Sequence, residues 1–152
     1  MSEPLYTRDI LRLASDIPHL APLDPADGTA DLRSPTCGSR VAVAVRLGPD
    51  RRVTAFSQSV TACAFGQASA ALMGHHAIGR DRAEVAQALA DLTAWLDGTT
   101  DVPVDWPGLA TLAPARDRAG RHGAILLPFR GLLGAIEVAG STPSAKVENR
   151  SS

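Results

Sequence analysis

The chain has 152 residues, of which 20% are charged, and a formal net charge of -1 at pH 7. A chain of this length buries roughly two-thirds of its unfolded surface, so one core suffices and folding needs neither disulfides nor metal. Acidic and basic residues are scattered along the sequence, which argues against nucleic acid or an anionic membrane surface as a partner.

The sequence predicts a cytoplasmic protein without a membrane span. No uninterrupted apolar run approaches the roughly 18 residues that a span needs. The first residues include Glu3 where a secretory signal carries lysine or arginine. In the cytoplasm Cys37 and Cys63 are expected to stay reduced, which leaves packing, metal binding or redox chemistry as their roles.

The N-terminal third is expected to hold one helix and one loop. Residues 5–16 should form an amphipathic helix that ends before Pro18, because their apolar residues recur at helical spacing: Tyr6, Ile10, Leu13 and Ile17. Residues 18–35 contain four prolines and Gly28. This composition predicts an extended surface connection, not a regular element.

A β-hairpin is the next predicted element. Residues 41–47 place valine and leucine at alternate positions, which is typical of a strand with one buried face. Gly48-Pro49-Asp50 should turn the chain, so that residues 52–60 return as a second, antiparallel strand.

The remaining pattern predicts helices. An alanine-rich helix follows Cys63 and stops before Gly79. The next helix starts at a capping-box pattern, Asp81 with Glu84, and ends before Gly98. A short helical piece over residues 109–112 should be closed by Pro114. A last helix should open at Arg121-His122, with Pro128 tolerated in its first turn.

These elements predict an α+β fold, with a small antiparallel sheet of about three strands and four to five helices packed on one face. No internal repeat or second domain is visible. We therefore expect residues 1–140 to form a single domain and residues 141–152 to form a disordered C-terminal tail.

Three residues are candidates for chemistry. Cys63 lies where a strand gives way to a helix, and a helix N-terminus stabilises a thiolate through its dipole and free N–H groups. Cys37 precedes Gly38, which permits a tight bend that exposes the sulfur. His122 offers an imidazole nitrogen suited to zinc or iron. From the pattern alone, inert core cysteines remain an open alternative, because no Cys-x-x-Cys pair fixes a ligand geometry.

Taken together, the motifs resemble the IscU/NifU-type iron-sulfur cluster assembly scaffold family over about residues 5–139. The resemblance rests on the valine-rich hairpin, the strand-Cys63-helix junction and five short segments: Tyr6 to Ile10, Pro35-Thr36-Cys37-Gly38, Gly79-Arg80-Asp81, Leu112-Ala113-Pro114 and Arg121-His122. It implies an α+β fold that binds iron or a labile [2Fe-2S] cluster. It also implies a cysteine desulfurase and cluster-acceptor proteins as partners. By resemblance, Cys37, Cys63 and His122 are the ligands.

Two positions depart from the family pattern. The aspartate that follows Cys-Gly in the family is replaced by Ser39. The third cysteine is missing, because Gly123 follows His122, or Ala124 if the alignment is anchored on Leu127-Pro128. One subunit thus offers three ligands where a two-iron cluster takes four.

The resulting hypothesis is a non-enzymatic, scaffold-like protein, monomeric or weakly dimeric, that binds iron or a labile [2Fe-2S] cluster through Cys37, Cys63 and His122. The alternative is an interaction module, with zinc as its metal, that docks on or regulates a cysteine desulfurase. A third option is a sulfur transferase with Cys63 as the acceptor.

Overall fold

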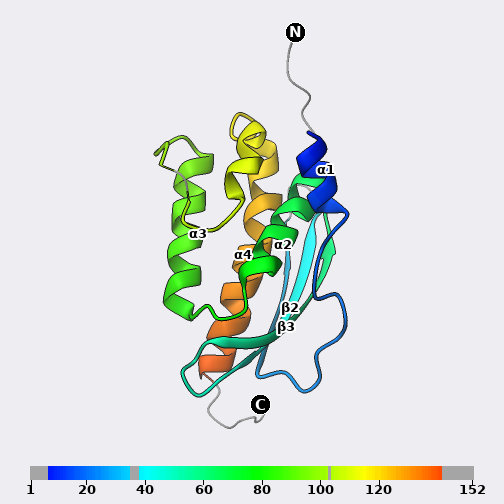
Figure 1. Ribbon diagram of the computed structural model, residues 1–152, viewed down its shortest axis with the longest axis vertical. Helices are drawn as coiled ribbons and strands as arrows, with labels where there is room; N and C mark the ends of the chain where they lie inside the picture. Colours follow the sequence, from blue (N-terminus) through cyan, green and yellow to red (C-terminus); the bar gives the residue numbers. More distant parts are fainter. Residues whose placement is uncertain (1–6, 35–37, 103, 142–152) are drawn as a thin grey trace.

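The computed structural model describes residues 7–34, 38–102 and 104–141, and it has an α+β fold with the helices on one face of a sheet (Figure 1). Three strands pair antiparallel in the order β1-β2-β3, as the sequence predicts. The elements in chain order are α1 (Arg8–Ala14), β1 (Gly28–Arg33), β2 (Arg40–Leu47), β3 (Val53–Thr61), α2 (Ala64–His76), α3 (Arg82–Leu96), the 3-10 helix η1 (Leu109–Ala115) and α4 (Ala119–Ser141).

The predicted hairpin is confirmed as β2 and β3. Val41, Val43 and Val45 are buried, and the residues between them are partly exposed. Val43 pairs with Gln58 and Val45 with Phe56, so the buried positions of both strands share one face. A register irregularity at Arg46/Leu47 marks the start of the turn.

The prediction that residues 18–35 contain no regular element is wrong, because Gly28–Arg33 forms β1 and pairs with residues 40–45 of β2. The inward positions of β1 are Gly28, Ala30 and Leu32, and only Gly28 is fully buried. Alternation between small and polar residues gives a weak strand signal. The small residues are there because α4 packs directly on this strand.

Helix α1 is confirmed, with Thr7 as its N-cap. The capping box of α3 is also present, since Asp81 Oδ1 accepts from the Glu84 N–H at 2.9 Å and Glu84 Oε1 accepts from the Asp81 N–H at 3.0 Å. The short helical piece is confirmed as η1, but Pro114 lies inside it and does not close it.

Helix α4 differs from its prediction in two ways. It begins at Ala119, so Pro128 lies in its interior and not in its first turn. By length and composition alone it could also cross a membrane, although charged residues such as Arg130 and Glu137 interrupt its apolar run. In its most apolar 18-residue stretch, 56% is buried within the protein, and the helix packs against β1, β2, α2 and α3. We therefore identify α4 as the core helix of the fold.

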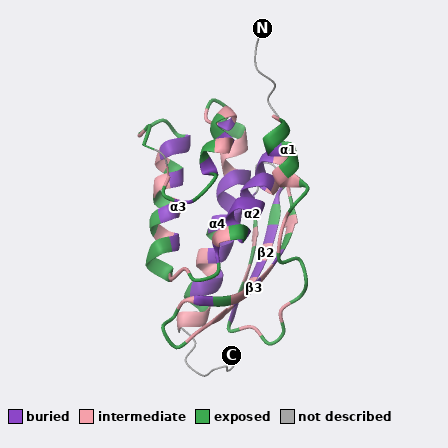
Figure 2. Ribbon diagram, in the orientation of Figure 1, coloured by how far each residue is buried: buried purple, intermediate pink, exposed green. Residues whose placement is uncertain are grey.

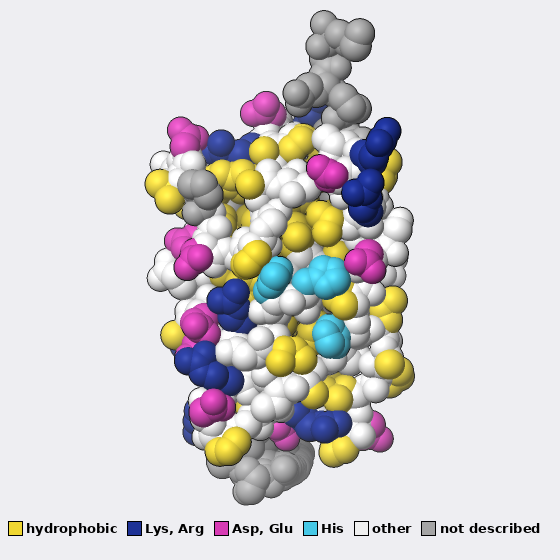
Figure 3. Space-filling model, in the orientation of Figure 1, with side chains coloured by type: hydrophobic (Ala, Val, Ile, Leu, Met, Phe, Trp, Pro, Cys, Tyr) yellow, Lys and Arg dark blue, Asp and Glu magenta, His cyan; other side chains and the backbone are white. Residues whose placement is uncertain are grey.

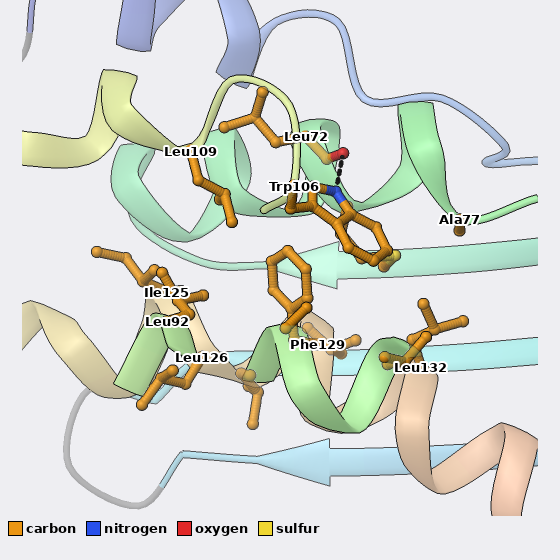
Figure 4. Packing of buried hydrophobic residues seen from close by; sticks show 14 of the residues in the cluster. Leu72, Ala77, Leu92, Trp106, Leu109, Ile125, Leu126, Phe129 and Leu132 are labelled. Atoms are coloured by element: carbon orange, nitrogen blue, oxygen red, sulfur yellow. Dashed lines mark hydrogen bonds between the residues drawn. The ribbon is translucent and has the colours of Figure 1, made fainter. Parts of the chain in front are cut away.

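The core lies between the sheet and the helices, where α2 and α4 are buried and the outer side of α3 is exposed (Figure 2). Trp106 packs edge-on against Phe129, with ring centroids 5.1 Å apart. Its indole Nε1 donates to the Leu72 carbonyl at 3.0 Å (Figure 4). This contact fixes the loop before η1 to the middle of α2.

Some predictions fall on residues outside the described part of the chain. They are the start of the first helix at residues 5–6, the placement of Cys37, and the tail after Ser141. The division into one domain and a tail stays a prediction.

Gly28→Ala should destabilise the fold. A Cβ at Gly28 would lie 2.2 Å from the Ala135 carbonyl oxygen and 2.5 Å from the Ala139 nitrogen. Both atoms belong to the backbone of α4, so strand and helix must move apart. We expect the free energy of unfolding, measured with urea, to fall by about 1–3 kcal/mol.

Gly120→Ala is the matched control, because in the part of the chain that the structure describes no atom outside its own helix lies within 4 Å of a Cβ there. Alanine should stabilise α4 by up to about 1 kcal/mol. Equal unfolding midpoints for the two variants would contradict the close packing of α4 on β1.

Candidate functional site

Three segments that are distant in the sequence meet at one end of the molecule, the end at which α2 and α4 begin (Figure 1). Arg40 pairs with Thr61, so the loop before β2 lies beside the strand end that leads to Cys63. A Cβ at Gly123, in the first turns of α4, would lie 3.2 Å from Ser34 Oγ at the other end of that loop. The fold therefore brings together the three segments that carry the predicted ligands.

Cys63 is the N-cap of α2, as the sequence predicts, with φ -67° and ψ 172°. Its sulfur makes no capping hydrogen bond to the helix. The side chain is partly buried, packs against the core and is a free thiol. The Cys63 side chain is therefore only partly buried, and it forms no capping hydrogen bond with α2.

Gly66 allows the N-terminal turn of α2 to approach α4 closely. A Cβ at this position would lie 2.7 Å from Ala62 Cβ and 3.2 Å from both the Cβ and the carbonyl oxygen of Ala124. Any side chain larger than glycine would push Cys63 and the first turns of α4 apart.

His122 lies in the first turns of α4, with its side chain partly buried. Its Nε2 lies 2.9 Å from the Ala115 carbonyl oxygen and 3.1 Å from that of Arg116. Both oxygens are acceptors only, so we assign the proton to Nε2. In the neutral imidazole, Nδ1 then keeps its lone pair.

The distal end of the His122 ring points toward η1. Residues two apart on an α-helix point in directions about 160° apart, and Ala124 faces α2. His122 therefore leaves α4 on the side away from the α2 contact. The His122 ring therefore lies at the edge of the region where the three segments meet. Gly123, in contrast, faces the loop that carries Ser34.

Cys37 lies outside the described residues, so its sulfur is not placed. The residues on either side are placed: the Gly38 N–H donates to the Ser34 carbonyl at 3.0 Å, and the Ser34 N–H donates to the Ser39 carbonyl at 2.8 Å. Gly38 has φ +72°, a left-handed conformation that glycine adopts without strain.

Ser39, which occupies the position of the family aspartate, is buried, with 3% of its surface exposed. Ser34 is also buried, at 8%. Ser34 and Ser39 thus place small, buried polar side chains at the two ends of the loop that holds Cys37. This side of the site is packed with small polar groups.

Asp97, the C-cap of α3, is a charged neighbour of His122 that the sequence did not reveal. The Thr99 hydroxyl and the Thr99 N–H both donate to Asp97 Oδ1, the latter at 2.9 Å. These hydrogen bonds, with a smaller contribution from His122, hold the pKa of Asp97 below its usual value. No local motif marks this residue, because only the tertiary fold brings α3 to α4.

Several histidine side chains also lie close together on the face seen in Figure 3. They are not among the predicted ligands. His75 and His76 end α2, and His75 Nε2 lies 3.4 Å from Asp16 Oδ2. Burial, with Arg80 and His75 nearby, lowers the pKa of His76. Among residues 7–34, 38–102 and 104–141, no three His, Cys, Asp or Glu side chains are grouped so that they could hold a metal.

No protein-family model matches the sequence, and no curated protein matches it. The fold is similar to several solved structures. A putative iron-sulfur cluster assembly scaffold protein for the SUF system from Fervidobacterium islandicum AW-1 is 17% identical, with a TM-score of 0.78, over 87% of this chain and 96% of that chain. A hypothetical protein is 22% identical, with a TM-score of 0.66, over 88% of this chain and 97% of that chain. These two show the shared fold.

A third solved structure is similar to this chain in sequence as well as in fold. The N-terminal part of a nitrogen-fixing NifU-like protein from Brucella abortus is 30% identical, with a TM-score of 0.84, over 90% of this chain and 95% of that chain. Identity and fold agree along nearly the full length of both chains. The chain therefore belongs to the IscU/NifU-type iron-sulfur cluster assembly scaffold family.

Proposed function

We propose that this protein carries iron or a labile [2Fe-2S] cluster as cargo, held by Cys37, Cys63 and His122. The observation that supports the proposal is the convergence of the β1-β2 loop, the start of α2 and the first turns of α4. Its role is to hold and hand over the cargo, with a cysteine desulfurase as sulfur source and acceptor proteins as recipients. The chain itself catalyses no reaction in this scheme.

Cys63 is the central ligand of the proposal. Thiolate is the ligand that iron-sulfur clusters take most often. Cys63 is the N-cap of α2, so it lies next to the first-turn N–H groups, which have no acceptor within the helix. The partial exposure of Cys63 gives iron and sulfide access from solvent.

His122 has the second contact that a ligating histidine commonly makes. Metal-bound histidines usually donate their other ring N–H to a carboxylate or carbonyl, which fixes both the tautomer and the ring. The two carbonyls at the end of η1 provide this contact to Nε2. Nδ1 is then the nitrogen that would bind the metal.

The cargo would be labile, because these residues supply three of the four ligands that a two-iron cluster takes. The fourth would come from a partner protein, a second subunit, a small thiol or solvent. A cluster with an external ligand is exchanged more easily than one with four protein ligands.

Zinc-bound regulation of a desulfurase is the second candidate function. It is favoured by the burial of Ser39 and by the absence of a thiol at Gly123, which leave a smaller ligand set than the family pattern. Two thiolates and one imidazole, with one open position, also suit zinc.

Cys63→Ser tests the central ligand. After anaerobic reconstitution with ferrous iron and sulfide, we expect the wild type to bind both in proportion to protein and the variant to retain neither. Metal analysis and visible absorption would measure this. Loss of stability by about 1–3 kcal/mol, with no change in metal binding, would show instead that Cys63 is only a core residue. A wild type that retains zinc alone would favour the second function.

The assigned tautomer of His122 can be checked directly. We expect the ring nitrogens, observed by nitrogen-15 NMR, to show a protonated Nε2 in the metal-free protein. Titration with zinc should then shift the Nδ1 resonance and leave the Nε2 proton in place. A protonated Nδ1 with a bare Nε2 would contradict the hydrogen bonds to Ala115 and Arg116.

Gly123→Cys restores the missing thiol of the family. Among the described residues, a Cβ there meets Ser34 Oγ alone, at 3.2 Å, so the loop needs to move by a few tenths of an ångström. We expect the reconstituted cluster to dissociate more slowly under a chelator than in the wild type. Gly123→Ala is the control, because it adds the same Cβ without sulfur. Equal chelation rates in both variants would mean that the pocket has closed.

A further inference from the structure

Pro128 interrupts the hydrogen bonding of α4 at a point that matters for the site. It lies in the helix interior and has no N–H, so the Ala124 carbonyl lacks its usual helical donor. The turns before Pro128 carry His122 and Gly123. Their orientation relative to the rest of α4 depends more on tertiary contacts than in an uninterrupted helix.

Ser69 supplies one of those contacts. Its Oγ donates to the Ile125 carbonyl at 2.6 Å, and its side chain is completely buried. Ser69 lies on α2, which begins at Cys63, and Ile125 lies on α4 just after His122. The hydrogen bond therefore joins the two helices that carry candidate ligands, on the N-terminal side of Pro128.

The close approach at Gly66 acts on the same pair of turns. Gly66 allows α2 and Ala124 to come close together, whereas the Ser69 hydrogen bond is directional and limits how α4 rotates and slides. Together they determine the spacing of the two helix N-termini.

We propose that Ser69 is a positioning residue, which holds the start of α2 and the start of α4 in the arrangement that Cys63 and His122 need to bind metal. The inference rests on the proposed function for its metal-binding part. Its geometric part, the placement of Cys63 beside α4, does not depend on metal.

Ser69→Ala tests the inference, because it removes one oxygen and adds no atom that could clash. Ile136→Val is the control: Ile136 is a buried residue of α4 far along the helix from His122, and its loss of one methyl group also lowers stability. Both variants are compared with the full-length wild type for thermal stability, Co²⁺ affinity and the rate at which iodoacetamide alkylates Cys63. Peptide mass mapping separates Cys63 from Cys37.

We expect Ser69→Ala to weaken Co²⁺ binding about 10- to 100-fold and to raise the alkylation rate of Cys63. Ile136→Val should lower the melting temperature and leave both other quantities unchanged. Equal effects of the two variants, or wild-type Co²⁺ affinity and alkylation in Ser69→Ala, would overturn the inference.

The two proposals fail in distinguishable ways. A wild type that binds Co²⁺ without the absorption of a sulfur-to-cobalt charge transfer would contradict Cys63 as a ligand, and with it the proposed function. The alkylation rate of Cys63 would then decide about Ser69 alone: a rise confined to Ser69→Ala supports its positioning role, and an unchanged rate contradicts it.

Discussion

The close packing of α4 against both the sheet and α2 is the constraint on which the structure depends. On the sheet side, Gly28 and Gly131 leave no space for a Cβ without displacing α4 backbone or the valines of β2. On the helix side, Gly66 does the same against Ala124. Contacts through backbone are less adjustable than contacts between side chains, which can change rotamer. They therefore fix the position of α4 along its length.

This packing also determines the geometry of the candidate site, because α4 begins there. Gly123 faces Ser34, His122 reaches the end of η1, and Ala124 contacts α2. A small shift of the helix would change all three relations together. The geometry of the candidate ligands is thus a consequence of core packing, and the residues that control it include several that lie away from the candidate site.

The sequence predicted those parts of the fold whose signal is local. Alternating valines identify β2, and the side chains of Asp81 and Glu84 mark the start of α3. It missed β1, whose inward residues are small because α4 lies against them. It also misjudged Pro128, which lies in the interior of α4, where the surrounding turns are buried against other elements.

The candidate site was partly predictable for the same reason. The N-cap position of Cys63 follows from a local change of pattern. Cys37 and His122 were candidates from their residue types and local sequence, and the family resemblance grouped them with Cys63 as ligands. The carbonyl partners of His122 and the nearby Asp97 come from η1 and α3, and no spacing in the sequence connects them to α4.

The two departures from the family pattern, at Ser39 and Gly123, both reduce the number of groups that could bind the proposed cargo. Ser39 and Ser34 are buried, so the side of the loop facing Gly123 is packed with groups that bind iron poorly. Cys63 and His122 are partly exposed at two helix ends. On the proposed function, the missing ligand would therefore have to arrive from the solvent side, where a partner can supply it and later withdraw it. A smaller ligand set then reduces retention and favours transfer, which links the loss of the third cysteine to the way the protein would hand over its cargo.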